Sequence, residues 1–333
     1  MLTADIHAVR SNADAMLANA THREPMKTAD SLSSATFERL VIGGERFVVK
    51  YVSTATDWIM RATGDVACRP LWMWRTGTLD LLPDCIDPLV VDVAHDVTTG
   101  VTAQLMPDVS ELFVPEGSGT LPLEQHHRFI DHMAALHATF WNWQGPADLT
   151  PLANRYTALA PMTAQVEAEL GHPDGVPSML LPLWQHLGVV APELAELSLA
   201  LTNQPDVLVA ALMETPMTLV HGDWKVGNLG SRPDGRTIVV DWAVPGLAPG
   251  CVDLGWYLAV NCDRLPESKE ATIAGYRDAL GRHGIDVAGW FDRQLELALL
   301  GAFVQLGWSK TNGLPELQWW VDRVTPTARD LLR

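Results

Sequence analysis

The sequence is poor in basic residues relative to acidic ones. Of its 333 residues, 23 are Lys or Arg and 40 are Asp or Glu, which leaves a net charge of −17. Nucleic acids and anionic membrane surfaces bind clustered Lys and Arg, so neither is expected as a partner. The surplus of carboxylates is compatible with a cationic substrate, and equally with an acidity that only keeps the protein in solution.

The sequence also has no CxxC pair of cysteines and no long apolar run, and we expect no leader segment. The four cysteines lie far apart without a CxxC motif, which argues against a zinc site or a dense disulfide framework. No run approaches the roughly 18 apolar residues of a membrane span, and the first residues lack the apolar centre of a signal peptide. We therefore expect a cytoplasmic protein.

The most informative stretch is residues 220–253, VHGDWKVGNLGSRPDGRTIVVDWAVPGLAPGCVD. Its HGD ends at Asp223, Asn228 follows five residues later, and an apolar strand at residues 237–240 leads into Asp241. Phosphoryl transfer from a nucleotide needs a group that positions the attacking hydroxyl, and oxygen ligands for magnesium. The pattern predicts that Asp223 accepts the hydroxyl proton and that Asn228 and Asp241 bind Mg²⁺.

This HGDxxxxN motif, followed by a strand that ends in DW, resembles the aminoglycoside phosphotransferase and choline kinase-like family, which is related to protein kinases. The resemblance implies an α+β, two-lobed protein-kinase-like fold with a small β-rich N-lobe and a large, mainly helical C-lobe. It implies Asp223 as catalytic base, Asn228 and Asp241 as metal ligands, and Lys225 as a contact of the transferred phosphate. ATP or GTP is then the co-substrate, Mg²⁺ the cofactor, and a small-molecule hydroxyl the acceptor.

Two β-rich runs at residues 35–42 and 45–52 flank Gly43-Gly44. Glycine reaches positive φ at little cost, so this pattern predicts a tight hairpin. The resemblance implies that the hairpin covers the nucleotide phosphates and that Lys50 pairs with them. It also implies that the polar loop before the hairpin contacts phosphate, and the residues expected there are Ser31, Ser33 and Ser34.

One residue of the family pattern is absent. A Glu on the helix after the hairpin normally pairs with the lysine, but this chain has no Glu between Tyr51 and Ser110. Asp57 and Asp65 are the available carboxylates, and we expect Asp65 to serve because its spacing fits better. The missing Glu also supports a second hypothesis, a catalytically weak or inactive nucleotide-binding module.

The resemblance, together with the composition of the linker, implies a division of the chain into three parts. We predict an N-lobe over residues 1–106, formed by a nucleotide-binding antiparallel sheet with an amphipathic N-terminal helix over residues 2–21. Residues 107–120 are acidic and rich in Gly, Pro and Ser, which predicts a hinge and linker. Residues 121–333 are predicted to form the helical C-lobe with the catalytic loop and the acceptor site.

The resemblance adds expectations at the hinge and beyond the catalytic block. In kinases, the segment that leaves the last strand of the sheet meets adenine, which here implies Gln104 and Met106 as nucleotide contacts. Asp253 begins a predicted helix and matches a residue that braces the catalytic loop. The small-molecule acceptor is then an aminoglycoside, an amino sugar, a choline-like alcohol or another sugar.

A third hypothesis is a metal-dependent phosphohydrolase that uses His95-Asp96 and the His-rich segment at residues 123–141. Two His ligands on one helical face need a spacing of three or four residues. No two histidines of this segment are three or four residues apart, so a metal-binding role for them is disfavoured.

Overall fold

A computed structural model describes residues 5–26, 34–117, 119–145, 148–172, 175–311 and 313–333. The chain separates into two compact units, each described by itself below. The N-terminal unit comprises Met1–Gly117 and Val226–Ala243, and the C-terminal unit comprises Ser118–Lys225 and Val244–Arg333. The hairpin that carries Asn228 and Asp241 thus groups with the N-terminal unit, although the sequence-based division placed it within residues 121–333. That division into functional domains stays a prediction.

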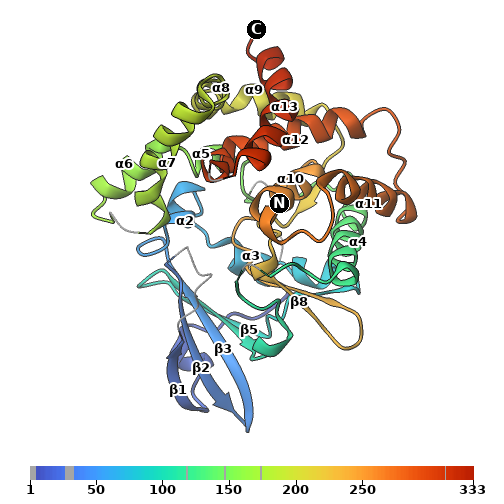
Figure 1. Ribbon diagram of the computed structural model, residues 1–333. Helices are drawn as coiled ribbons and strands as arrows, with labels where there is room; N and C mark the ends of the chain where they lie inside the picture. Colours follow the sequence, from blue (N-terminus) through green and yellow to red (C-terminus); the bar gives the residue numbers. More distant parts are fainter. Residues whose placement is uncertain (1–4, 27–33, 118, 146–147, 173–174, 312) are drawn as a thin grey trace. The chain divides into compact units, whose positions relative to one another are not determined.

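A five-stranded antiparallel sheet forms the centre of the N-terminal unit (Figure 1). Its strands lie in the order β1-β2-β3-β6-β5. Their bounds are β1 Ala20–Met26, β2 Thr36–Ile42, β3 Glu45–Val52, β6 Val101–Pro107 and β5 Asp92–Asp96. The short helices of the unit are α1 Ala13–Met16, α2 Trp58–Ala62 and α3 Arg69–Arg75, with 3₁₀ turns at Thr78–Leu81, Ser110–Leu112 and Val226–Asn228.

The predicted Gly-Gly hairpin is confirmed. Gly43 and Gly44 have φ angles of 61° and 92° and join β2 to β3, with Ile42 opposite Glu45. Side chains alternate across a strand, so Val49 and Lys50 point to opposite faces. Val49 packs in an apolar cluster with Leu40 and Leu105. Lys50 lies on the opposite face of the sheet, together with the residues that pair with it on β2 and β6.

The predicted N-terminal helix over residues 2–21 is wrong for most of its length. Of residues 5–21, which the structure describes, only α1 is α-helical, and it is capped at its start by Asn12, whose side chain accepts from the N–H of Ala15. Before it, Arg10 lies beside the sheet edge: its N–H donates to the carbonyl of Val93, and its carbonyl accepts from His95. Arg10 pairs with β5, and β1 pairs with β2. These contacts satisfy backbone N–H and C=O groups that a helix would have paired internally.

A second, three-stranded sheet holds the hairpin of residues 226–243 within the N-terminal unit. It consists of β4 Ile86–Asp87, β9 Thr237–Val239 and β8 Leu229–Ser231, in that order. The N–H of Val114 donates to the carbonyl of Leu229 at 3.0 Å, and the Arg232 guanidinium binds the Asp87 carboxylate at 2.7 Å. These contacts fix the hairpin to the segment that follows β6 and to β4.

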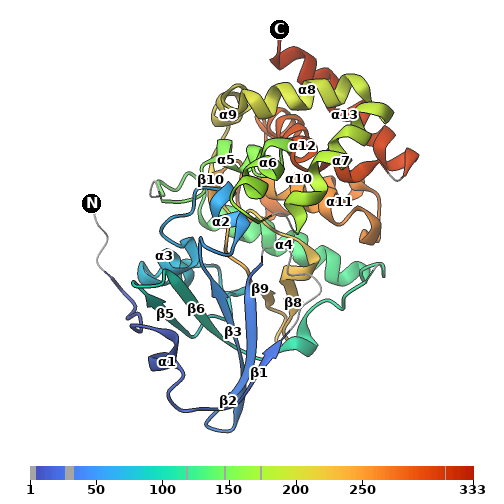
Figure 2. The same cartoon turned by 90° about the vertical axis from the view of Figure 1, so that its left-hand side faces the viewer.

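The C-terminal unit is mainly helical, and Figure 2 shows its helices from the side. One two-stranded sheet, β7 Thr218–Val220 with β10 Gly246–Ala248, lies in it. No helix in the described part of the chain is both long and apolar enough to span a membrane. The helices are α4 Leu123–Thr139, α5 Leu152–Thr157, α6 Pro161–Glu169, α7 Val176–Val190, α8 Pro192–Asn203, α9 Pro205–Met213, α10 Cys251–Val260, α11 Lys269–Arg282, α12 Phe291–Leu306 and α13 Leu314–Leu331.

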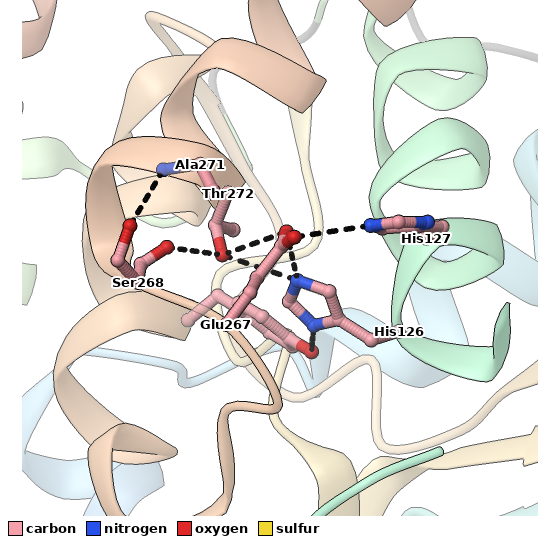
Figure 3. A network of polar contacts seen from close by, with 7 residues as sticks. His126, His127, Glu267, Ser268, Ala271 and Thr272 are labelled. Carbon is pink, nitrogen blue, oxygen red and sulfur yellow. Dashed lines mark hydrogen bonds and ion pairs between the residues drawn. The ribbon is translucent and has the colours of Figure 1, made fainter. Parts of the chain in front are cut away.

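A polar network around the buried His126 joins α4, α10 and α11 (Figure 3). Its Nδ1 lies 2.9 Å from the Tyr257 hydroxyl, and its Nε2 lies 3.1 Å from Oε1 of Glu267 and 3.1 Å from Oγ1 of Thr272. The neutral ring satisfies these partners if Nε2–H donates to Glu267 and Nδ1 accepts from Tyr257. Burial lowers the pKa of His126, and the Glu267 carboxylate offsets only part of that effect.

This lowered pKa predicts a pH dependence of stability. The unfolded chain binds a proton at His126 near the ordinary pKa of 6.5, before the folded protein does. The stabilisation is therefore complete above pH 6.5 and declines as pH falls below it. We expect His126→Gln to lower the melting temperature at pH 7.5 and to flatten its decline between pH 7 and 5, measured by thermal unfolding.

His127→Gln is the matched control. His127 is exposed and its Nε2 contacts the same Glu267 at 3.2 Å, but it is not enclosed by the three helices. It should leave the pH dependence of the wild type in place. Equal slopes for wild type and His126→Gln would contradict the assignment.

Candidate active site

A cavity of about 420 Å³ lies in the N-terminal unit, within the size range of small-molecule sites. One wall is the sheet face that carries Lys50, with Val48 beside it and Gln104 and Met106 on the neighbouring strand β6. The rest of the lining comes from the segments around β4–β5, the chain after β6 and the hairpin of residues 226–243. The cavity therefore gathers five predicted site residues: Lys50, Gln104, Met106, Asn228 and Asp241.

Lys50 and Asp241, which both line this cavity, form an ion pair. The lysine Nζ lies 2.5 Å from Oδ1 of Asp241, and the lysine side chain is only 8% exposed. Its ammonium also faces the ring of Phe37, whose centroid is 5.9 Å away. A buried ammonium requires a close opposite charge, and the carboxylate supplied by the hairpin meets that need.

Asp57, rather than Asp65, is the second carboxylate near this pair, which corrects the sequence-based preference. The Asp65 carboxylate accepts from the backbone N–H of Arg69 at 2.9 Å, before α3, and lies 3.9 Å from the Arg69 guanidinium. Asp57 caps α2 through the N–H groups of Ile59 and Met60. Burial raises the pKa of Asp57 to about 6, although the charge of Lys50 lowers it and that of Asp241 raises it.

Asn228 and Asp241 come together because of the β8–β9 register. Leu229 lies opposite Val239, and the carbonyl of Asn228 accepts from the N–H of Val240, which places Asp241 at the adjoining position. Asp241 has a φ of 66°, an uncommon conformation for any residue but glycine, and the buried Trp242 follows it. Strained backbone of this kind often marks a functional position.

The serine-rich loop is only partly described. Ser31 and Ser33 lie outside the described residues. Ser34 is exposed, has a φ of 69°, and is absent from the cavity lining. Its phosphate-binding role stays a prediction.

Asp223 and Lys225, which are predicted to accept the hydroxyl proton and to contact the phosphate, belong to the C-terminal unit. Strand β7 delivers His221, whose ring is buried and whose Nδ1 accepts from the backbone N–H of Asp223 at 3.1 Å. The Lys225 Nζ lies 3.1 Å from Oδ2 of Asp223, and both side chains remain partly accessible. An ammonium group therefore lies beside the carboxylate that is predicted to accept the hydroxyl proton.

Asp253 braces this loop, as the sequence analysis expected. Its buried carboxylate accepts from the backbone N–H of His221 at 2.7 Å and from that of Gly222 at 2.9 Å. Nε2 of His137 lies 3.3 Å from the same carboxylate. Burial acts to raise the pKa of Asp253, but the hydrogen bond and charge of His137 and other nearby cations hold it below its ordinary value. The helix itself begins earlier than predicted, at Cys251.

Two neighbours of Asp223 were not found from the sequence. The Trp256 indole N–H donates to Oδ1 of Asp223 at 2.9 Å, and the guanidinium of Arg155 lies over the Trp256 ring, 5.0 Å from its centroid. Trp256 follows Asp253 by three residues, so both lie on the same side of α10. That spacing was the only signal in the sequence.

The histidines proposed for a phosphohydrolase have other partners. His95 contacts Oγ1 of Thr102 through Nδ1, and Asp96 accepts from the N–H of Thr98 in a turn. In the part of the chain that the structure describes, no group of three His, Cys, Asp or Glu side chains is arranged to hold a metal ion.

The chain matches a model of the phosphotransferase enzyme family (APH) over residues 114–290, more than half of its length. No protein among the curated sequences matches it. Many solved structures match its fold.

Three of these structures illustrate the likeness. The choline kinase LicA from Streptococcus pneumoniae aligns at 12% identity with a TM-score of 0.52, over 93% of this chain and 95% of that one. A thermostable mutant of aminoglycoside phosphotransferase APH(4)-Ia gives 15% identity and a TM-score of 0.47, over 93% and 95%. A microcompartment-associated aminopropanol kinase gives 17% and 0.47, over 94% and 92%.

The predicted fold class is confirmed. The chain has a kinase-like fold with a β-rich N-terminal region and a helical C-terminal region, and helix makes up 50% and strand 16% of it. Helix thus outweighs strand, as the α+β class with a larger helical part requires.

The raised pKa of Asp57 predicts a stabilising substitution. Its folded pKa of about 6 exceeds the ordinary 3.8, so stability falls as pH rises between these values and the full cost remains above pH 6. Asn also caps helices but does not ionise. We expect Asp57→Asn to raise the free energy of unfolding by on the order of 1–3 kcal/mol at pH 7.5, and by much less at pH 4. Urea unfolding without nucleotide or divalent metal measures this difference.

Asp96→Asn is the control of opposite sign. Asp96 is a partly exposed carboxylate at the end of β5, and the hydrogen bond from the N–H of Thr98 lowers its pKa, so its removal brings no gain at pH 7.5. If Asp57→Asn destabilises the protein equally at pH 4 and pH 7.5, the burial of a costly charge at Asp57 is refuted.

Proposed function

We propose that this chain, which belongs to the phosphotransferase enzyme family, transfers the γ-phosphoryl group of ATP or GTP to a hydroxyl of a small molecule. One observation carries the proposal: a single cavity presents a buried lysine, a carboxamide and a carboxylate, namely Lys50, Asn228 and Asp241. This is the set of charges and oxygen ligands that a nucleotide triphosphate with a divalent cation requires.

Within the cavity, Lys50 is assigned to the phosphate oxygens of the nucleotide. Asn228 and Asp241 offer oxygen ligands, the type that Mg²⁺ prefers, so the residues present fit this cofactor. Bound Mg²⁺ would neutralise charge on the phosphates. The contact between Lys50 and Asp241 supports this arrangement, since it holds the phosphate-binding cation and the metal-binding carboxylate within one ion-pair distance.

The lining also offers apolar surface for a nucleobase, from residues that include Val48, Met106, Phe113 and Val114. Apolar walls with a few polar groups are typical of sites that bind a flat, partly polar ring. We propose Gln104 and Met106 as contacts of the nucleotide.

The chemistry is assigned to the C-terminal unit. Asp223 accepts the proton of the acceptor hydroxyl as the oxygen attacks phosphorus, and Lys225 contacts the phosphoryl group in transfer. The His221 ring accepts a backbone hydrogen bond from Asp223, which supports a role in holding the loop rather than in proton transfer. Support for Asp223 comes from its position in HGDxxxxN and from the bracing of its loop by Asp253.

For the acceptor we propose a cationic alcohol, such as an aminoglycoside, an amino sugar or a choline-like compound. The net charge of −17 supports it, because carboxylates around a site concentrate cations. The structural likeness to a choline kinase is consistent with such an acceptor.

The second candidate is a nucleotide-binding module with little or no turnover. The observation in its favour is the lack of any Glu between Tyr51 and Ser110, so that Lys50 pairs with Asp241 instead. Both candidates predict nucleotide binding, and only the first predicts phosphoryl transfer.

We expect Asp223→Asn to reduce ADP release from Mg²⁺·ATP by a factor of about 10²–10⁴, because the reaction loses its base. Nucleotide affinity should change little, since the cavity is lined by residues of the N-terminal unit. ADP release and titration with a fluorescent ATP analogue measure the two quantities. Asp234→Asn, which changes an exposed turn residue, serves as the control. Nucleotide binding by the wild type without turnover across amines, sugars and amino sugars would establish the second candidate.

The same panel tests the acceptor class. If carboxylates attract a cationic acceptor, its KM should rise several-fold between 50 and 500 mM salt, because screening weakens long-range attraction (roughly 10 Å Debye length at 0.1 M). The KM of a neutral sugar acceptor is the internal control. A KM for the preferred acceptor that does not respond to salt contradicts recruitment by charge.

A further inference from the structure

The carboxylate of Asp223 is held from two sides within the C-terminal unit. The Trp256 N–H donates to Oδ1 at 2.9 Å, and the Lys225 Nζ lies 3.1 Å from Oδ2. A carboxylate offers about four acceptor sites, and these two donors occupy one on each oxygen. Together they fix the rotation of the carboxylate about its χ2 bond, which is otherwise broad and soft.

Helix α10 controls both the backbone and the side chain of this loop. Asp253, in its first turn, binds the N–H groups of His221 and Gly222, and Trp256, one turn later, binds the carboxylate of Asp223. Since the two residues lie on one helix, the same element fixes the loop backbone and the orientation of the carboxylate. A base must be placed within hydrogen-bond reach of the proton it removes, so this common support is useful for catalysis.

Arg155 on α5 completes the arrangement. Its guanidinium lies 5.0 Å from the centroid of the Trp256 ring and close to Gly222, where an added Cβ would come within 2.8 Å of its Nη1. The side chain is buried, and among the described residues its Nε and Nη2 have no hydrogen-bond partner. Burial of an incompletely paired guanidinium is costly, and the charges of Asp253 and Asp223 offset part of that cost.

We propose that Trp256 is a positioning residue for Asp223 and that Arg155 holds the Trp256 indole in place by stacking on its ring. Trp256 acts on the base by one directional hydrogen bond, and Arg155 acts on Trp256 by stacking. The inference deepens the proposed function and rests on the assignment of Asp223 as the base.

Trp256→Phe tests the first part, because Phe keeps an aromatic face for Arg155 and removes only the donor. We expect kcat for ADP release from Mg²⁺·ATP, with water or the best acceptor of the panel, to fall about 10-fold, which corresponds to about 1.4 kcal/mol, as for one hydrogen bond to a charged group. KM for ATP should stay unchanged. Trp308→Phe is the matched control, since that partly buried indole donates to the carbonyl of Gln305 at 2.7 Å, away from Asp223.

A double-mutant cycle separates a positioning role from a merely structural one. If Trp256 acts through Asp223, Trp256→Phe should cause no further loss of kcat in the Asp223→Asn background. An equal further loss in that background, or a kcat of Trp256→Phe equal to that of Trp308→Phe, overturns the inference and leaves the proposed function intact. Full turnover by Asp223→Asn, or no ADP release by the wild type, overturns the proposed function itself.

Arg155→Lys tests the second part and keeps the buried positive charge, which Arg155→Met would remove. The planar stacking is lost, and we expect kcat to fall about 3-fold to 10-fold in the wild-type background and much less when Trp256 is already Phe. Melting temperatures of both variants report any general destabilisation. An unchanged kcat for a folded Arg155→Lys overturns the role of Arg155.

Discussion

The buried carboxylate of Asp253 is the contact on which the catalytic loop depends. Two successive backbone N–H groups, from His221 and Gly222, donate to its two oxygens, and His137 approaches from α4. A fully buried carboxylate is tolerated only when its acceptor sites are filled, and here the groups that fill them belong to the loop. Gly222 has a φ of 85°, and an added Cβ would lie 2.0 Å from the Val244 carbonyl, so no larger residue fits this turn. The fold and the loop conformation thus require each other.

The N-terminal unit shows a comparable dependence around Lys50. The face of the sheet that carries Lys50 is left open for a cavity because Val49, one residue earlier, takes the apolar packing on the other face. The hairpin of residues 226–243 then supplies Asp241 as the counter-charge. A segment close to the catalytic loop in sequence therefore completes the lining of a cavity formed by the first third of the chain.

Much of this could be predicted from the sequence, because the signals were local. Glycine pairs, apolar runs and the block from His221 to Asp241 each reflect a requirement of a few neighbouring residues, and the structure places Lys50, Asn228 and Asp241 around one cavity. The predicted N-terminal helix was wrong because pairing with β5 overrode helical periodicity. The preference for Asp65 failed because spacing alone does not show that Arg69 claims its carboxylate, whereas Asp57 lies near Lys50. Trp256 and Arg155 lie 33 and 68 residues from Asp223, and only the fold reveals their contacts.

Both units keep charged groups in places where burial opposes their charge. Burial raises the pKa of Asp57 near Lys50, and it lowers that of Arg155 beside Trp256. A chain selected for stability alone would replace such groups by neutral ones, because the free energy lost on desolvation is recovered only in part by distant opposite charges. These charges lie next to the residues assigned to phosphate binding and to proton transfer. Their positions are explained if they orient catalytic groups, because a preformed electrostatic environment need not reorganise during the reaction. On this view, the buried charges of Asp57 and Arg155 are retained for their effect on neighbouring groups rather than for the stability of the fold.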